Sequence, residues 1–167
     1  MVAPVVREVR PEDGPQISAL HARAFGPGRF ARTAYRIREG TGAFSRYCRV
    51  CLIDGRIIAA ARFTPIRIGG TDGALLLGPL AVDPEFANRG HGRGLVRDGM
   101  DAARADGLGL VLLVGDEPYY ARLGFVRVPA GHIALPGPVN PQRLLAADLR
   151  PGGLADYRGL VMAVVQR

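Results

Sequence analysis

The sequence predicts an α/β fold in which a mixed, mostly antiparallel sheet carries helices on both faces. One sign is an apolar stretch at Leu75–Val82, followed by an amphipathic stretch at Leu95–Asp106 and a second apolar stretch at Leu108–Val114. A strand, a helix of about twelve residues and another strand make a βαβ crossover, so the two strands should run parallel. A second sign is a hairpin pattern, because Arg46–Ile53 and Arg56–Ile68 flank a two-residue turn. This antiparallel pair leads directly into the crossover.

The N-terminal region predicts one strand and two helices. Val5–Val9 has the composition of a short first strand. Asp13 and Gln16 have the spacing of a capping box, and the helix that follows should stop at Gly26-Pro27. The apolar residues of that first helix are Ile17, Leu20, Ala24 and Phe25; those of the second helix, which Gly40 ends, are Phe30, Ala34 and Ile37.

Cys48 and Cys51 form a C-x-x-C pattern inside the predicted hairpin. Residues three apart on a strand point to opposite faces, so these thiols should not converge on a metal or close a disulfide. Both are interpreted as reduced strand residues. No metal site is expected.

A glycine-rich stretch, Arg89-Gly90-His91-Gly92-Arg93-Gly94, precedes the crossover helix. The first amides of a helix have no intrahelical partner and favour an anion, and glycines let a phosphate approach closely. Arg89 and Arg93 can add charge-assisted hydrogen bonds. The stretch therefore predicts a phosphate site, with a flexible, ligand-free helix start as the alternative. The absence of a following Lys-Ser/Thr pair and the G-x-G-x-G spacing argue against nucleoside triphosphate and dinucleotide loops.

Two motifs resemble one family. Leu80–Leu95 is similar to the acyl-CoA signature of the GNAT N-acetyltransferase superfamily, and Tyr119–Phe125 is similar to its tyrosine and Gly-Phe element. Pro136–Val139 and Leu149–Leu154 further resemble the YhbS-like bacterial branch, although Ala87 stands where the family usually has Gln or Arg. The resemblance implies a GNAT-like central sheet of about six to seven strands with a splayed parallel pair.

That resemblance also implies an N-acyltransferase that moves an acetyl group from acetyl-CoA to a primary amine by direct attack. The backbone of Leu80, Ala81 and Val82 would receive pantetheine, near Gly78-Pro79, where regular strand pairing should weaken. The cofactor's diphosphate would bind Arg89, Gly90, His91, Gly92, Arg93 and Gly94.

Tyr120 would be the general acid, because a phenol with a pKa near ~10 stays protonated at neutral pH. Tyr119 would pack or shape the pocket, and both tyrosines as plain packing residues remain the alternative. The general base stays open among Asp116, Glu117, His21 and His132; the candidates for the acceptor pocket, or for simple packing, are Phe30, Tyr35 and Arg38.

The crossover helix should bury Leu95, Val96, Gly99, Met100 and Ala103, with Arg97 and Asp101 spaced for an i,i+4 pair. In the tail, Pro141–Ala147 predicts a short helix and Leu160–Val165 a last strand.

Composition is consistent with a single domain over residues 1–167. The net charge is +7, yet all the basic residues are arginines spread along the chain, which argues against a nucleic-acid partner. No membrane span or leader is evident, so a cytoplasmic location is expected. The expected partner is a small-molecule or peptide amine, and a homodimer stays open. The rival functions are a nonenzymatic acyl-CoA-binding or sensing domain, a nucleotide-binding oxidoreductase and a basic nucleic-acid module.

Overall fold

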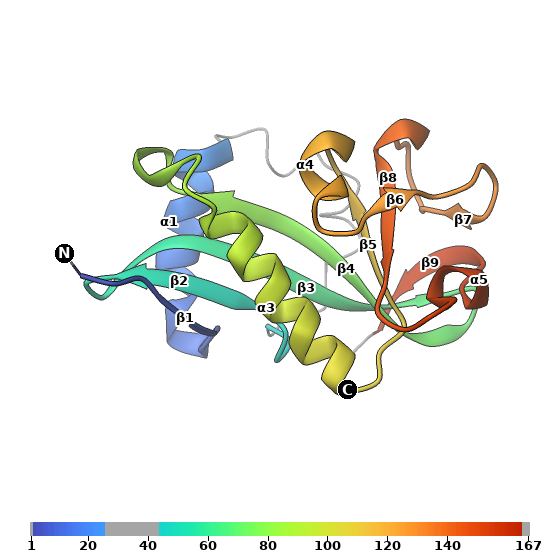
Figure 1. Cartoon of the computed structure of the whole chain (residues 1–167), viewed down its shortest axis with the longest axis horizontal. Helices are drawn as coiled ribbons and strands as arrows, with labels where there is room; N and C mark the ends of the chain where they lie inside the picture. Colours follow the sequence, from blue (N-terminus) through green and yellow to red (C-terminus); the bar gives the residue numbers. More distant parts are fainter. Residues whose placement is uncertain (1, 26–43, 165–167) are drawn as a thin grey trace.

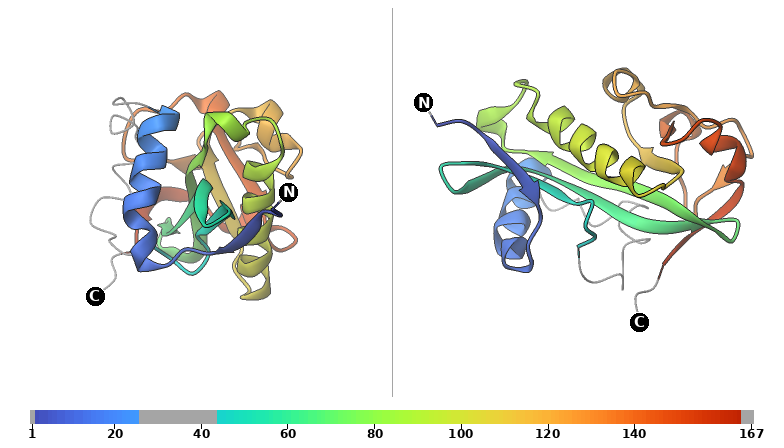
Figure 2. Two further views of the ribbon diagram at one scale, coloured as in Figure 1. Left: turned by 90° about the vertical axis from the view of Figure 1, so that its left-hand side faces the viewer. Right: turned by 60° about the horizontal axis from the view of Figure 1, so that its bottom comes forward.

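The computed structural model describes residues 2–25 and 44–164 of the chain. A mixed sheet runs through the molecule with helices on both faces, as predicted (Figure 1, Figure 2). The elements are, in chain order, β1 (Val5–Glu8), η1 (Pro11–Asp13), α1 (Gly14–Phe25), β2 (Arg49–Ile53), β3 (Arg56–Ile68), β4 (Thr71–Val82), η3 (Pro84–Phe86), α3 (His91–Ala105), β5 (Leu110–Val114), α4 (Glu117–Ala121), β6 (Val126–Arg127), β7 (Ile133–Ala134), η4 (Pro141–Arg143), β8 (Leu144–Asp148), α5 (Gly153–Asp156) and β9 (Gly159–Ala163).

The strand order across the sheet is β1-β2-β3-β4-β5-β8-β6, while β9 pairs with the end of β3 and β7 pairs with β9. β4 and β5 are the parallel pair that the crossover predicts, and α3 is the helix that connects them. The other pairs along this path are antiparallel. The predicted fold class is confirmed. The described residues form nine strands, more than expected, because β6 and β7 have two residues each and are too short to leave a periodic pattern.

The parallel ladder between β4 and β5 is short. It consists of the pairs Ala74–Leu110, Leu75–Val111 and Leu76–Leu112. Beyond Leu76, β4 continues along β3, and the end of β5 pairs with β8. The two strands therefore diverge at Gly78-Pro79, where the sequence predicts a weakening of the pairing.

The two large helices cover opposite faces of the sheet (Figure 2). The five residues of the predicted apolar stripe on α3 are all buried. Gly99 lies so close to Phe63 of β3 that a Cβ at this position would overlap the ring. On the other face, Ile17 and Leu20 of α1 pack against β2 and β3. Both stripes agree with the sequence pattern.

The predicted hairpin is present between β2 and β3. Asp54 and Gly55 have φ angles of 51° and 76°, the left-handed pair of a type I′ turn. Cys48 packs in the core beneath α1, and Cys51 packs in the core beneath α3. Both thiols are free, so the interpretation of opposite-facing, reduced cysteines is confirmed.

The start of α1 differs from the predicted capping box. Asp13 ends the preceding turn η1, and its carboxylate accepts the Arg10 N–H at 2.7 Å and two bonds from the Arg7 guanidinium at 2.7 and 3.0 Å. Gln16 instead accepts the N–H of Ile57 on β3 through Oε1 at 3.2 Å. Asp13 therefore caps the start of η1, at Arg10, instead of the start of α1, because η1 places its carboxylate next to β1.

The tail also corrects the prediction. Pro141–Ala147 is not a helix: only η4 is helical, and β8 begins at Leu144. Residues 144–147 are all buried between β5 and β6, so pairing on both sides outweighs their helix propensity. The predicted first and last strands correspond to β1 and β9.

On α3, Asp101 pairs with Arg104 at 3.1 Å rather than with Arg97. The predicted second helix, with its pocket candidates Phe30, Tyr35 and Arg38, lies outside the described residues.

Within the described residues, no helix combines the length and the apolar run that a membrane crossing requires. The same residues contain no group of three or more His, Cys, Asp or Glu side chains placed to hold a metal ion.

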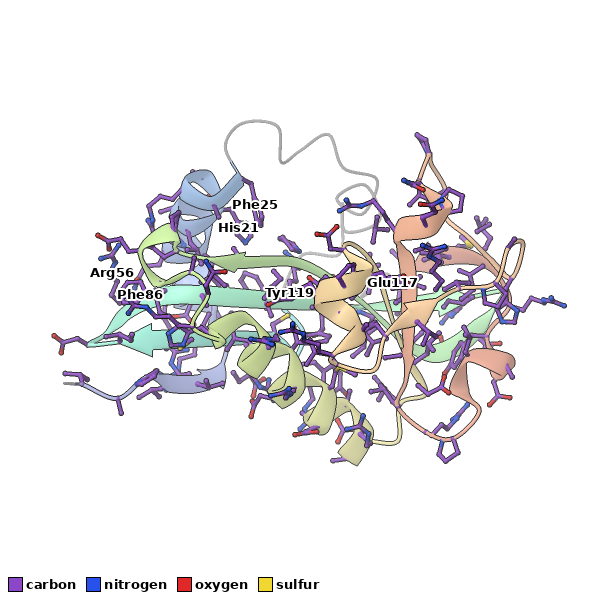
Figure 3. The ribbon with its side chains drawn as sticks, turned by 45° about the horizontal axis from the view of Figure 1, so that its top comes forward. His21, Phe25, Arg56, Phe86, Glu117 and Tyr119 are labelled. Carbon is purple, nitrogen blue, oxygen red and sulfur yellow. The ribbon has the colours of Figure 1, made fainter. Side chains whose placement is uncertain are left out.

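A buried carboxylate anchors the loop that leaves β4. Asp83 is 2% exposed, and its Oδ1 accepts the Glu85 N–H at 3.0 Å. Its Oδ2 lies 3.2 Å from Nε of Arg23 on α1 and 3.0 Å from Nη2 of Arg56 on β3. Arg56 and Phe86, the last residue of η3, are seen together at this end of the molecule (Figure 3). One side chain thus connects the loop to α1 and to the hairpin.

Acidification should weaken the junction between β1 and α1. The hydrogen bond from Arg7 holds the pKa of Asp13 below its ordinary value, against the opposing effect of burial. The stabilisation is therefore fully present above the unfolded pKa of about 3.9 and is lost as pH falls through the lower folded pKa. Urea unfolding from pH 7 to pH 2 should show a steeper loss of unfolding free energy for the wild type than for Asp13→Asn. Parallel curves would contradict this.

Asp83→Asn should lower the unfolding free energy by about 1–3 kcal/mol, because a buried carboxylate that bonds two arginines becomes a neutral amide. Glu85→Gln is the matched control. Glu85 lies 3.7 Å from Arg56 with both side chains largely exposed, so its change should stay within about 0.5 kcal/mol. Urea unfolding measures both, and equal effects would rule out the anchoring role of Asp83.

Candidate functional site

The glycine-rich stretch is half loop and half helix. α3 begins at His91, one turn earlier than the predicted Leu95, after Gly90 in the left-handed conformation at φ 83°. Glycine adopts this conformation without steric cost, which lets the chain turn sharply into the helix. Gly94 already donates its N–H to the Gly90 carbonyl at 3.0 Å. The N–H groups of His91, Gly92 and Arg93 have no acceptor among the described residues, so they form a set of free donors.

The side chains around these donors leave the helix start positively charged. The Arg89 guanidinium lies over the Phe86 ring at 5.4 Å from the centroid. The His91 ring is turned toward the sheet, with Nδ1 3.9 Å from Sγ of Cys51. His91 therefore contributes its main-chain N–H at the helix start rather than its imidazole. Arg93, in the first turn of α3, is partly buried.

The diverging end of β4 offers an unpaired backbone edge. Leu80, Ala81 and Val82 pair with residues 59–61 of β3 on one side. No described strand pairs with them on the other side, which faces the gap toward β5. A strand edge of this kind can receive an extended molecule that carries amides, in the manner of an added strand.

Tyr119 reaches from α4 across this gap to α3. A Cβ placed on Gly92 would lie 2.8 Å from Oη of Tyr119, 3.3 Å from Cγ2 of Val82 and 3.5 Å from Cδ2 of Leu80. The Tyr119 hydroxyl, the first turn of α3 and the diverging part of β4 therefore meet at one point (Figure 3). Sequence reasoning missed this contact, because nothing in the local pattern says how far a tyrosine of α4 extends.

Tyr120 packs beside it, deeper in the structure. Its ring lies edge-on to the rings of Tyr119 and Phe125, with centroids at 4.8 and 5.7 Å. A Cβ on Gly115, just after β5, would lie 2.8 Å from Cε2 of Tyr120. The absence of a side chain at Gly115 thus gives this ring its place. The structure brings both tyrosines to the carboxyl end of β5, as the sequence predicts.

The surroundings of the Tyr119 phenol favour its protonated form. Burial raises its pKa above the ordinary value, and the positive charge of Arg93 opposes part of that rise. At neutral pH the hydroxyl is therefore a hydrogen-bond donor. The same hydroxyl also has lone pairs to accept a bond.

The four candidates for the general base lie in different places. Asp116 is 3.6 Å from Arg143, and Glu117 is 3.4 Å from Arg127. His132 lies with Nε2 2.8 Å from the Leu154 carbonyl, near α5. His21 alone among the four lies on α1, well apart from Glu117 and Tyr119 (Figure 3).

His21 lines a small hollow on the α1 side of β4. The hollow is shallow and open to solvent, and its lining includes Pro79, at the point where β4 diverges from β5. Arg62 lies over the Phe44 ring at 5.0 Å from its centroid. Both of these side chains also line the hollow. Sequence spacing could not reveal this grouping, because its residues come from distant parts of the chain.

Comparison with known proteins places this geometry in a family. The model of the Acetyltransferase (GNAT) family matches residues 15–125. The uncharacterized N-acetyltransferase YhbS of Escherichia coli strain K12 is 32% identical over 123 residues, which cover 72% of this chain and 72% of that protein. The crystal structure of Escherichia coli YhbS in complex with CoA has a TM-score of 0.84 and 28% identity, covering 98% of this chain and 91% of that one.

A GNAT family acetyltransferase from Brucella melitensis, in complex with acetyl-CoA, has a TM-score of 0.63 and 29% identity, covering 87% of this chain and 96% of that one. The family match includes β4, α3 and α4, the three elements that meet at the site. The chain therefore belongs to the GNAT family of acetyltransferases.

Proposed function

We propose that this protein transfers the acetyl group of acetyl-CoA to the primary amine of a small molecule or peptide by direct attack. A continuous path supports this function: the free amides of residues 91–93, the unpaired β4 edge at residues 80–82 and the tyrosine pair of α4. The structures of Escherichia coli YhbS and of the Brucella melitensis relative contain CoA and acetyl-CoA, which favours the same co-substrate here.

The residues at the start of α3 fit a diphosphate. The N–H groups of His91, Gly92 and Arg93 would donate to its oxygens, and the helix dipole would favour its charge. Arg89 and the guanidinium of Arg93 would add charge-assisted bonds. A Cβ on Gly92 would fill the space between this turn and β4, so glycine keeps the cradle open. Gly90 contributes the sharp turn, whereas the Gly94 N–H is already bonded to the Gly90 carbonyl and a Cβ at Gly94 would meet nothing within 4 Å.

The edge of β4 would hold the pantetheine arm. Leu80, Ala81 and Val82 would pair with its amides, and a main-chain N–H near Val82 would bond the carbonyl oxygen of the thioester as negative charge develops there. The amine nitrogen forms a bond to the carbonyl carbon, and the C–S bond breaks. Tyr120 would donate its proton to the departing thiolate, since a phenol titrates above a thiol, near ~10 against ~8.5.

The acceptor would approach from the α1 side, where the hollow beside Pro79 opens to solvent. Among the candidates for the base, His21 is the one that lines this hollow, and it would take the proton that the attacking amine loses. The cytoplasm, where CoA thioesters are made and used, remains the proposed location. Whether the protein forms a homodimer is a question for measurements of its mass in solution.

Turnover decides between an enzyme and a nonenzymatic acyl-CoA-binding domain. Acetyl-CoA should raise the melting temperature of the protein more than NAD does, since a ligand that binds the folded state stabilises it. CoA release should then be screened over amines, amino acids, aminoglycosides and peptides. Stabilisation by NAD alone would point to the oxidoreductase, and binding without turnover on any amine to a sensing domain.

Gly92→Ala should weaken acetyl-CoA binding by about tenfold, because the new methyl group occupies the space beside the free amides and displaces the Tyr119 hydroxyl. Gly94→Ala is the matched control. A Cβ there meets nothing within 4 Å, so affinity should change by less than roughly twofold while the helix gains about 0.5–1 kcal/mol of stability. Calorimetric titration and urea unfolding measure the two effects. Equal affinities for both variants would contradict the cradle.

Tyr120→Phe should lower kcat by roughly 10²-fold or more, because the departing thiolate loses its proton donor, and should leave the Kd for acetyl-CoA nearly unchanged. Steady-state CoA release and calorimetric titration measure these constants. An unchanged kcat would remove Tyr120 as the acid.

A further inference from the structure

The point where α4, β4 and α3 meet lies midway along the proposed path of the co-substrate. Oη of Tyr119 is at the place where Gly92, Val82 and Leu80 come together. Gly92 belongs to the proposed diphosphate cradle, and Leu80 and Val82 belong to the edge proposed for pantetheine. On that path, the hydroxyl would lie at the junction between the two segments of the ligand, where its phosphate joins the pantetheine arm.

Of the three atoms nearest to a Cβ placed on Gly92, the Tyr119 hydroxyl oxygen is the polar one; the other two are methyl carbons of Val82 and Leu80. The amides of His91, Gly92 and Arg93 can only donate, while a phenol can both donate and accept. A 4′-phosphopantetheine group presents phosphate oxygens, a hydroxyl and amides within a few bonds of one another. A single phenol at the junction can donate a hydrogen bond to a phosphate or carbonyl oxygen, or accept one from a hydroxyl or an amide N–H.

The neighbouring tyrosine is placed differently. Tyr120 is packed against Gly115 and Phe125 and is partly buried, whereas Tyr119 is 39% exposed and spans the gap to α3. Successive residues on a helix are separated by about 100°, so the two rings of α4 serve different surroundings. Packing explains the position of the Tyr120 ring but not the reach of the Tyr119 hydroxyl to the first turn of α3.

We propose that Tyr119 is a binding residue whose hydroxyl contacts the 4′-phosphopantetheine segment of acetyl-CoA, while Tyr120 serves the chemical step. This inference rests on the proposed function, since it assumes that acetyl-CoA follows the path from α3 to β4. In this structure the hydroxyl oxygen lies beside Gly92, so the side chain bridges α4 to α3. On binding, the hydroxyl exchanges this position for a hydrogen bond to the ligand. Protonation of the phenol at neutral pH, which burial favours, keeps the donor available.

The test compares Tyr119→Phe with Tyr120→Phe, the same removal of one oxygen at adjacent positions. Tyr119→Phe should raise the Kd for acetyl-CoA and for 4′-phosphopantetheine by about tenfold, as expected for the loss of a bond to a charged or strongly polar group. Its Kd for adenosine 3′,5′-bisphosphate, which lacks the pantetheine arm, should change by less than roughly twofold, as should kcat at saturating acetyl-CoA. Tyr120→Phe should show the reverse pattern.

A spectroscopic readout is available because the chain contains five tyrosines and no tryptophan. The near-ultraviolet circular dichroism of the protein therefore comes largely from tyrosine rings. Adding 4′-phosphopantetheine, which does not absorb there, should change this signal in the wild type and in Tyr120→Phe. The change should be much smaller in Tyr119→Phe at matched saturation.

A double variant tests the geometry directly. In Gly92→Ala the new methyl group would lie 2.8 Å from the Tyr119 oxygen and must displace it, so this variant already removes the contact. Adding Tyr119→Phe should then weaken binding little further, and the two losses should be clearly less than additive. Additive losses would overturn the contact.

The failures are distinguishable. If the wild type and Tyr119→Phe bind acetyl-CoA and 4′-phosphopantetheine equally well, and urea unfolding shows both folded, the Tyr119 contact is wrong while the proposed function stands. If the wild type binds neither molecule, the proposed function and the contact are both wrong.

Discussion

The architecture of the site depends on the short length of the parallel ladder between β4 and β5. Only the pairs from Ala74–Leu110 to Leu76–Leu112 form, and then β4 follows β3 while β5 is paired with β8. Pro79 has no backbone N–H and cannot extend the ladder. When the strands diverge at this residue, Pro79 therefore leaves no N–H without a partner. The same divergence exposes a backbone edge between two covered faces of the sheet. Among the described residues, the elements that form the proposed acyl-CoA path lie around that opening: the first turn of α3, the edge of β4 and the rings of α4.

Two contacts hold the walls of the opening in position. Asp83 bonds arginines from α1 and β3 and so restrains the chain between β4 and α3. Farther along, Gly99 allows α3 to approach the ring of Phe63 on β3. Because Asp83 holds the loop and α3 packs closely on the sheet, the free amides of residues 91–93 keep a defined direction relative to β4. Donors that are oriented before a ligand arrives lose less freedom on binding, which is how a main-chain cradle can hold a charged group.

The two adjacent tyrosines of α4 point in different directions and have different surroundings. Tyr120 has its place because Gly115 leaves room for the ring, and it is supported by Phe125. Tyr119 extends across the opening to α3 because Gly92 has no side chain in its way. Each ring therefore depends on a glycine in a different element. A division between binding and proton transfer is compatible with this arrangement, and it would allow each hydroxyl to be adjusted without disturbing the other.

The sequence by itself determined the elements whose patterns are local. The apolar runs, the Asp54-Gly55 turn and the stripe on α3 predicted the hairpin, the crossover and the parallel pair, and the motifs indicated the family. Tertiary structure decided what depends on distant partners. Leu144–Ala147 is a strand because β5 and β6 pair with it, and Gln16 bonds β3 because η1 had already supplied the cap. The reach of Tyr119 to Gly92 and the grouping of His21 with Pro79 arise in the same way. Periodicity reports which face of an element is buried, but the partner of a side chain is selected only when the layers pack, because that choice depends on residues far away in the chain.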